Sequence, residues 1–246
     1  MVKQKLGVSI VIPCFNEAET IALLLQSLKE IVPNSSYNIE IIIVDGCSTD
    51  STPKILEKAF LDLDHDIFSL VLMKERLGYG NDIMEGLRRS RYEYMSWTHA
   101  DLQTDPSDVI KGINLLKLVH SEKIIIKGER KSRKILDVIL TFAMQVVVFL
   151  VLRVNLSDIN AQPKIFPRRF YDNILEKEAP TDFSLDLFLL YQAKKNKYEI
   201  ISFPVEFKKR QLGIAKGGGG SLVNRWNLIK RTLKYIFKLR EELNNK

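Results

Sequence analysis

The sequence predicts an α/β fold in which parallel strands alternate with helices. Apolar, β-branched runs at 8–12, which Pro13 stops, and at 39–44 each lead through a polar loop into a helical pattern. This repeat favours parallel βαβ units with right-handed crossovers. The 246 residues, 46% hydrophobic and 27% charged, have the composition of an ordinary globular protein and are numerous enough for a substantial core.

The apolar pattern places the expected elements along the chain. In the first half, strands are expected at 8–12, 39–44, 68–73 and in the run from Tyr92, with helices at 21–31, from about Lys54, and at 81–90. In the second half, strands are expected at 123–127 and 198–207, with helices at 135–154, from 182 to about 195, and in the basic tail. Ligands of such folds bind at the carboxyl edge of the sheet, where the polar loops lie.

The polar loop after the fourth strand carries three potential ligands. His99, Asp101 and Gln103 alternate along it, so they would project to one side if the chain stays extended. Imidazole, carboxylate and amide oxygen at this spacing could hold a divalent cation that bridges a diphosphate. The alternative is a polar turn that caps the next helix.

A second polar loop follows the strand at 39–44. Asp45 lies at the end of that strand, where a carboxylate can accept a hydrogen bond from a base N–H or a ribose hydroxyl. Neither GxxxxGKS/T nor GxGxxG occurs in the chain, so the common phosphate-binding loops are missing. A diphosphate would need another clamp, such as a metal.

Composition restricts the partners and the compartment. The net charge of +7 favours anionic partners, but no recognition motif for nucleic acid is present, so nucleic acid is not expected. The N-terminal apolar run is too short for a secretory signal. Cys14 and Cys47 lie far apart, without the spacing of a zinc site. We expect a cytoplasmic protein without a disulfide framework.

Two features of the second half indicate an anionic or lipid partner. Five cations lie within residues 127–134, as a phosphate clamp or an exposed, solvated loop. The apolar helix at 135–154 is interrupted by polar residues. The fifteen residues between Asp137 and Arg153 would span about 22 Å, short of the ~30 Å hydrocarbon core. We therefore expect a buried helix or one in a membrane interface, not a membrane span.

Three segments resemble one known family. They are SIVIPCFNE at 9–17, IVDGCSTDST at 43–52 and HADLQ at 99–103. In order and spacing they are similar to motifs of the family-2 glycosyltransferases with the GT-A fold, and especially of the dolichol- or polyprenyl-phosphate sugar synthases. The resemblance covers about residues 7–215. It implies a Rossmann-like, mixed and mainly parallel sheet with helices on both faces, and inverting transfer of a sugar from a nucleotide diphosphate with the help of Mg²⁺ or Mn²⁺.

The resemblance assigns the donor pocket to the first two loops. Pro13, Phe15 and Glu17 would line the nucleobase and ribose pocket, and Asp45 would read the base. Gly46 departs from the family, which usually has a second aspartate there. This departure removes a negative charge from the donor side.

The resemblance also assigns the metal and the diphosphate. Asp101 would bind the metal and Gln103 could join its shell. His99 replaces an aspartate usual in the family, and a neutral imidazole suits Mn²⁺ but carries no compensating charge. The segment from 208 to 216 resembles a flexible loop of the family in which Arg210 and Lys216 would close over the diphosphate.

The second half would bind the acceptor. Arg130 and Arg133 are the candidates for a phosphate clamp, and Gln162 replaces a small residue in a segment similar to the family's Ser-Asp-x-x-x-Gly. Asp186 aligns with the acid that removes the proton of a hydroxyl acceptor in inverting enzymes. A lipid phosphate is already ionised and needs no base, so Asp186 could instead orient a cation.

The tail beyond the four glycines at 217–220 predicts a basic amphipathic helix, which is either a membrane-surface anchor or a seam between subunits. We expect a catalytic domain at 1–215 and a hinge with this helix at 216–246. The predicted function is sugar transfer from a UDP- or GDP-linked donor to polyprenyl phosphate or a lipid-linked saccharide, by an enzyme peripheral to the inner face of the cell membrane. The alternative is a catalytically degenerate, nucleotide-sugar-binding scaffold.

Overall fold

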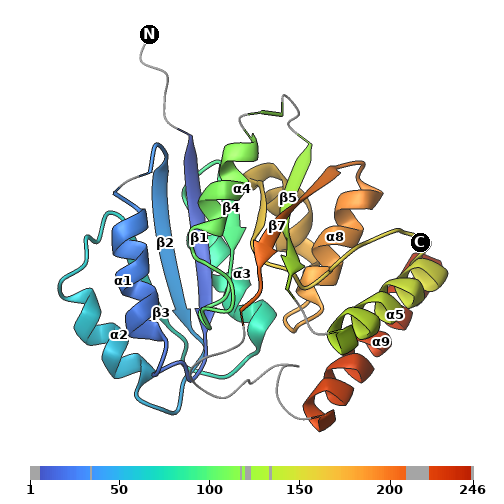
Figure 1. Cartoon of the computed structure of the whole chain (residues 1–246), viewed down its shortest axis with the longest axis horizontal. Coiled ribbons are helices and arrows are strands. Elements are labelled where there is room, and N and C mark those ends of the chain that lie inside the picture. The colour runs from blue at the N-terminus through green and yellow to red at the C-terminus, as the bar shows by residue number, and fades with distance from the viewer. Residues whose placement is uncertain are drawn as a thin grey trace.

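A computed structural model describes residues 6–33, 35–116, 118–119, 123–132, 135–208 and 222–244. Its centre is a seven-stranded sheet (Figure 1). The strands are β1 (Gly7–Cys14), β2 (Asn38–Asp45), β3 (Phe68–Leu72), β4 (Tyr94–Trp97), β5 (Ile124–Lys131), β6 (Lys164–Pro167) and β7 (Glu199–Glu206). Their spatial order is β3-β2-β1-β4-β6-β5-β7.

The sheet is mixed and mainly parallel, as the sequence predicts. Among the described strands, only β6 runs antiparallel to its neighbours β4 and β5, whereas the β1–β2, β1–β4, β2–β3 and β5–β7 pairs are parallel. Six strands therefore end at the same edge, which we call the carboxyl edge. Loops at this edge of an open α/β sheet form the usual ligand crevice.

Helices cover both faces of the sheet (Figure 1). Ile10 and Ile12 of β1 pack with apolar side chains of α1, α2 and α4, whereas Val11 packs on the opposite face with those of α3 and α8. This alternation is the period of two expected of a strand buried on both faces. The helices are α1 (Ile21–Ile31), α2 (Thr52–Phe60), α3 (Tyr79–Arg89), α4 (Asp108–Leu116), α5 (Ile135–Leu152), α6 (Arg168–Phe170), η1 (Tyr171–Leu175), α7 (Glu176–Glu178), α8 (Leu185–Lys195) and α9 (Leu222–Asn244).

The structure differs from the sequence prediction in three places. β6 and the helical segment at 168–178 were not expected, whereas α4 is the helix that the alternative reading of the polar loop placed after it. The first strand also continues through Pro13, which pairs with Val44 of β2. This proline is tolerated because β4 pairs with β1 only as far as Val11, so its missing N–H falls beyond the last rung between these two strands.

Helices α5 and α9 lie side by side near the carboxyl edge (Figure 1). Val148 of α5 and Ile236 of α9 join the core cluster, but most of α5 is exposed, with Phe142 at 64% and Leu150 at 69%. Among the described helices, only α5 is long and apolar enough to cross a membrane by length and composition. It has 18 residues, three more than the fifteen between Asp137 and Arg153 whose length the sequence analysis compared with the hydrocarbon core. Buried core helices can pass the same test, but here 11% of the segment is buried.

Candidate active site

The site lies at the carboxyl edge, where the loops after β1, β2 and β4 meet the first turns of α3 and α8. These helices are joined at their starts, because Asn81 N donates to Thr181 O at 2.9 Å. Gly80 permits this approach, since a Cβ there would lie 2.6 Å from the carbonyl oxygens of Pro180 and Asp182. The contact brings Tyr79 and Asp186, far apart in sequence, to one place.

Asp45 and Ser48 link the loop after β2 to the loop after β1 through hydrogen bonds. Its Oδ2 accepts a bond from Ser48 N at 3.0 Å, and its Oδ1 accepts one from Ser48 Oγ. Ser48 Oγ in turn accepts a bond from Asn16 N at 2.7 Å. Burial raises the pKa of the neighbouring Cys14 thiol, and the Asp45 charge raises it further, so Cys14 stays a neutral core residue.

The predicted donor residues of β1 lie at the same edge in different environments. Pro13 is buried within β1. The Glu17 carboxylate is also buried and accepts a bond from Thr20 Oγ1 at 3.0 Å. Phe15 is half-buried, and the Arg76 guanidinium carbon lies 4.0 Å from the centre of its ring. One face of the Phe15 ring is thus covered by a cation.

The loop after β4 does not stay extended as the alternation of His99, Asp101 and Gln103 required. The strand ends at Trp97, residues 100–104 form bends, and Leu102 has a φ of +55°. Asp101 Oδ1 accepts a bond from Gln103 N at 3.1 Å, so these residues form a local turn. Gln103 Nε2 donates to Lys208 O at 3.2 Å, and Lys208 N donates to Gln103 O at 2.8 Å.

Tyr79 links the β4 loop to α8. Its hydroxyl lies 3.1 Å from His99 Nε2 and donates to Asp186 Oδ2 at 3.4 Å. Its ring stacks on Phe183 with centroids 4.7 Å apart. Burial raises the pKa of Tyr79 and the Asp186 charge raises it further, so the hydroxyl keeps its proton and remains a donor.

Asp186 is buried at 3% exposure and is held by several donors. Its Oδ1 accepts bonds from Lys164 Nζ at 2.8 Å and Gln162 Nε2 at 2.9 Å. Together with Tyr79, these donors engage both carboxylate oxygens. The first turn of α8 adds the favourable end of a helix dipole, which explains how a buried carboxylate is tolerated here.

A second buried lysine lies beside the first. Lys127 of β5 and Lys164 of β6 are direct partners in the antiparallel register, and Trp97 is the partner of Lys164 on β4. Burial and, to a smaller extent, the neighbouring Lys164 charge lower the pKa of Lys127 to about 8. Burial also lowers the pKa of Lys164, opposed by the Asp186 charge. Lys164 Nζ donates in addition to Ile159 O and Ala161 O, at 2.8 and 2.6 Å.

Arg130 lies next to this cluster and is paired with Asp158. Asp158 accepts bonds from the Arg130 backbone N at 2.7 Å, from Nε at 3.0 Å, and from Nη2. This bidentate arrangement uses much of the guanidinium fork that a phosphate clamp would need. Two of the predicted acceptor residues are therefore bonded to acids, Gln162 to Asp186 and Arg130 to Asp158.

Comparison with known proteins identifies the family. The model of glycosyl transferase family 2 matches residues 9–135, which is just over half of the chain. The chain belongs to glycosyl transferase family 2. Two relatives are an undecaprenyl-phosphate 4-deoxy-4-formamido-L-arabinose transferase of Pseudomonas fluorescens, 28% identical over 125 residues, and a dodecaprenyl-phosphate galacturonate synthase of Rhizobium johnstonii, 26% identical over 131 residues. The matches cover 51% and 53% of this chain but only 36% and 38% of the relatives.

Solved structures confirm the GT-A fold of this family-2 chain. Glucosyl-3-phosphoglycerate synthase of Mycobacterium tuberculosis, solved with Mn²⁺, UDP and glucosyl-3-phosphoglycerate, is similar over 95% of this chain and 79% of its own, with a TM-score of 0.67 and 16% identity. A mannosyltransferase of Pyrobaculum calidifontis with GDP-mannose and Mn²⁺ is similar over 87% of this chain and 59% of its own, with a TM-score of 0.60 and 21% identity. At identities of 16% and 21%, the similarity shows a shared fold and nothing about the substrate of this chain.

The described residues contain no preformed metal cage, since no three His, Cys, Asp or Glu side chains converge on one point among them. Of the expected ligands, His99 Nε2 faces Tyr79 and Asp101 Oδ1 accepts the Gln103 N–H. A metal that arrives with a diphosphate needs only one or two protein carboxylates. The half-buried Asp101 fits that smaller requirement.

Three predicted site residues, Arg133, Arg210 and Lys216, lie outside the described residues. Tyr79, Lys127 and Lys164 were not singled out from the sequence. A lysine in the apolar run Lys164-Ile165-Phe166 signals a buried cation that needs a partner, but its partner cannot be read from the chain. Lys208, two residues beyond the end of β7, is bonded to Gln103.

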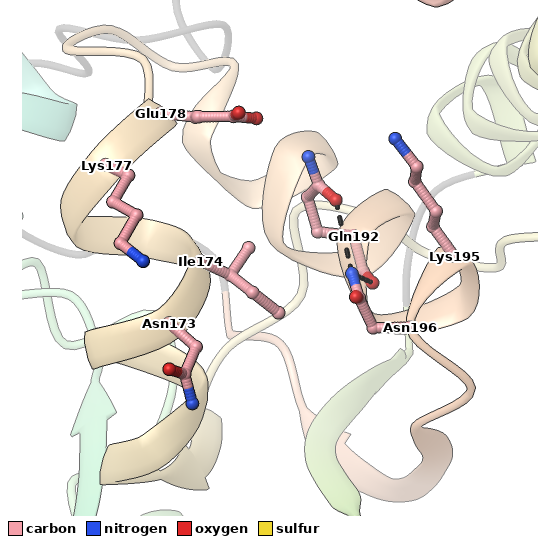
Figure 2. Close-up of a pocket in the computed structure, with 7 residues that line it drawn as sticks. All are labelled: Asn173, Ile174, Lys177, Glu178, Gln192, Lys195 and Asn196. Atoms are coloured by element: carbon pink, nitrogen blue, oxygen red, sulfur yellow. Dashed lines mark hydrogen bonds between the residues drawn. The ribbon is translucent and has the colours of Figure 1, made fainter.

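A separate polar hollow lies between α8 and the helical segment at 168–178 (Figure 2). It is lined by Asn173, Ile174, Lys177 and Glu178 on one side and by Gln192, Lys195 and Asn196 on the other. α8 begins at the carboxyl edge beside Asp186 and ends near Lys195, so the hollow lies at the opposite edge of the sheet and is not part of the candidate active site.

Proposed function

We propose that this family-2 enzyme moves a sugar, with inversion, from a UDP- or GDP-linked donor to a polyprenyl phosphate at the cytoplasmic face of the membrane. Family membership and the polyprenyl-phosphate relatives support the reaction class. The observation that favours a phosphate acceptor is that Asp186 is buried and hydrogen-bonded on both oxygens. A base must lie within hydrogen-bond reach of the acceptor hydroxyl and be able to take its proton, whereas Asp186 is buried and bonded to Lys164, Gln162 and Tyr79.

A phosphate acceptor needs no such base. One of its ionised oxygens attacks the anomeric carbon and forms the new bond, while the bond from that carbon to the donor diphosphate breaks and its electron pair leaves with the diphosphate. No proton has to be removed from the acceptor. In this reading Asp186 is a positioning residue that orients Lys164, Gln162 and Tyr79.

The donor would occupy the loops after β1 and β2, with Pro13, Phe15, Glu17 and Asp45 around the nucleoside. Asp101, with Gln103 and His99 beside it, would hold Mg²⁺ or Mn²⁺, which offsets negative charge on the departing diphosphate. Solved relatives of the fold with nucleotide and Mn²⁺ support this arrangement. Arg210 and Lys216, which follow Lys208 in the sequence, would add positive charge.

The membrane contact would be made by α5 and α9. Apolar side chains of α5 such as Phe142, Phe149 and Leu150 are more than half exposed, and exposed Lys230 and Lys234 lie on the neighbouring α9. Apolar surface beside cations favours binding to an anionic membrane surface. α9 also buries Ile236 within the same chain, so part of its apolar stripe is not available as a seam between subunits.

The donor site is tested by calorimetric titration of UDP and GDP with and without Mn²⁺. We expect one nucleotide to bind in a metal-dependent way, and binding to be lost in Asp101→Ala. Asp105→Ala is the matched control, because it removes an acid from the same loop that instead accepts the Ser107 N–H at 2.9 Å. If neither nucleotide binds the wild type, the proposed function is wrong.

The acceptor is tested with undecaprenyl phosphate and, separately, a lipid-linked saccharide in liposomes, with a panel of UDP- and GDP-linked sugars. The double variant Lys164→Met/Asp186→Asn removes both buried charges while it keeps their volumes. We expect it to retain transfer to undecaprenyl phosphate. A loss of turnover much greater than tenfold in the double variant but not in folded Lys164→Met, with unchanged nucleotide binding, or transfer only to the saccharide hydroxyl, would show that Asp186 acts as a base. Nucleotide-sugar binding without any transfer would favour a scaffold.

A further inference from the structure

Gly46 lies where the family usually has a second aspartate, and the structure shows what fills that space. A Cβ on Gly46 would lie 2.3 Å from Asp82 Oδ2 and 2.6 Å from Arg76 Nη1. Real side chains do not approach this closely, so the two charged groups occupy the volume that any side chain at residue 46 would need. The residue types at positions 46 and 82 are therefore coupled through space.

Arg76 and Asp82 form one unit with the loops after β1 and β2. Arg76 Nη1 lies 2.7 Å from Asp82 Oδ2 and donates to Gly46 O at 3.4 Å. The same guanidinium covers Phe15, with 4.0 Å between its carbon and the ring centre. The Asp82 side chain is 2% exposed, whereas that of Arg76 is 38% exposed. A buried acid thus holds a partly exposed cation at the mouth of the predicted donor pocket.

We propose that Asp82 is the positioning acid of the donor pocket: from α3 it supplies the carboxylate that residue 46 lacks, and it holds the Arg76 guanidinium against Phe15 for contact with the nucleotide. This inference rests on the proposed function, because it takes the loops after β1 and β2 as the nucleotide site. It gives Asp82 a part in donor binding, although Asp82 is outside the three motifs that resemble the family.

A carboxylate at this place is costly, which argues against a purely structural role. Asp82 Oδ1 finds no hydrogen-bond partner among the described residues, and buried acceptors without partners destabilise a protein. Burial raises the pKa of Asp82 to about 6, against the lowering effect of Arg76. The first turn of α3 offsets part of the cost through its dipole. An apolar side chain would fill the same space without this penalty, but it could not hold Arg76.

The test moves the carboxylate from α3 to the loop after β2. Nucleotide affinity is measured by calorimetry with Mn²⁺ and whichever of UDP and GDP binds the wild type. In Asp82→Ala, we expect affinity to fall roughly 10- to 100-fold, because a charge-assisted contact that orders Arg76 is lost. In Gly46→Asp/Asp82→Ala, the vacated space accepts the new side chain, and affinity should return to within about threefold of wild type. Gly46→Asp alone should lose affinity because its side chain collides with Asp82.

Glu85→Ala is the matched control, since Glu85 is also an acid of α3 but pairs with Arg88 and Arg89 at 2.8 Å on the exposed side. It should bind nucleotide as the wild type does. If Asp82→Ala does not fold, Asp82→Asn keeps the volume and should still lose about tenfold in affinity.

The inference is overturned if folded Asp82→Ala or Asp82→Asn binds as tightly as the wild type, or if the double variant folds but recovers no affinity. A wild type that binds neither nucleotide overturns the proposed function instead. Recovery in the double variant separates positioning from a merely structural role, because a general loss of packing in α3 would not be repaired by an acid on the β2 loop.

Discussion

Replacing Lys164 by methionine removes the buried cation that faces Asp186. Lys164 is 0% exposed, and its ammonium donates to Asp186 Oδ1, Ile159 O and Ala161 O at 2.6–2.8 Å. Loss of one partner of a buried ion pair costs about 3–5 kcal/mol, because the other charge stays buried without compensation. For a chain of this size, that cost lowers the melting temperature by roughly 6–20 °C.

The double variant Lys164→Met/Asp186→Asn distinguishes the ion pair from simple packing. It leaves no uncompensated charge, so we expect it to recover about 2 kcal/mol or more of the free energy of unfolding. The measurement is urea unfolding followed by circular dichroism at pH 7. Lys131→Met is the control, because Lys131 pairs with Glu129 at 3.4 Å and both side chains are exposed, at 52% and 43%, so it should cost under about 1 kcal/mol. If the single and double Lys164 variants unfold at the same urea concentration, the reasoning is refuted.

Three further predictions concern other parts of the site. Tyr79→Phe removes the hydroxyl between His99 and Asp186, so turnover should fall about tenfold with unchanged nucleotide affinity. Tyr37→Phe is the control, because it loses a 2.7 Å bond to Asn114 away from the site and should keep normal turnover. Equal effects of the two substitutions would contradict a role of Tyr79 in the active site. Because the pKa of Asp82 is raised to about 6, its charge costs stability above that pH and not below about pH 4. The free energy of unfolding of wild type relative to Asp82→Asn should therefore fall by up to about 3 kcal/mol as the pH rises across this window, whereas a flat difference in urea titrations would show that the pKa is ordinary. Phe142→Glu/Leu150→Glu places charges on the exposed face of α5, so flotation with anionic liposomes should drop at least about tenfold; unchanged flotation would exclude α5 from the membrane contact.

Local patterns predicted much of the first half of the fold. The runs at 8–12 and 39–44 are continuously apolar because β1 and β2 are buried on both faces, and the polar loops after them lie at the carboxyl edge as expected. Such information is carried by neighbouring residues, so the order of the chain reveals it. Pro13 was misjudged because its tolerance depends on where β4 ends, which is a property of the sheet.

The second half depended more on long-range pairing. β6 has only four residues, too few for a periodic signal, yet its antiparallel register places Lys164 opposite both Trp97 and Lys127. No residue near Lys164 in the sequence indicates that Asp186, on another element, will form an ion pair with it. Of the two roles that the sequence left open for Asp186, base or partner of a cation, we propose the second, because its donors are assembled only when β6 lies between β4 and β5.

By itself, the sequence determined the α/β class, the family and the loops that carry the donor-side motifs, since strand and helix periods and short motifs are encoded in adjacent residues. Only the tertiary structure decided which charges meet. The absence of an acid at Gly46 was visible in the chain, but its replacement by Asp82 was not, because Cβ direction and helix placement set which side chain fills that volume. The partners of Asp186 were decided in the same way, by strand register and by the close approach of α3 to α8 at Gly80.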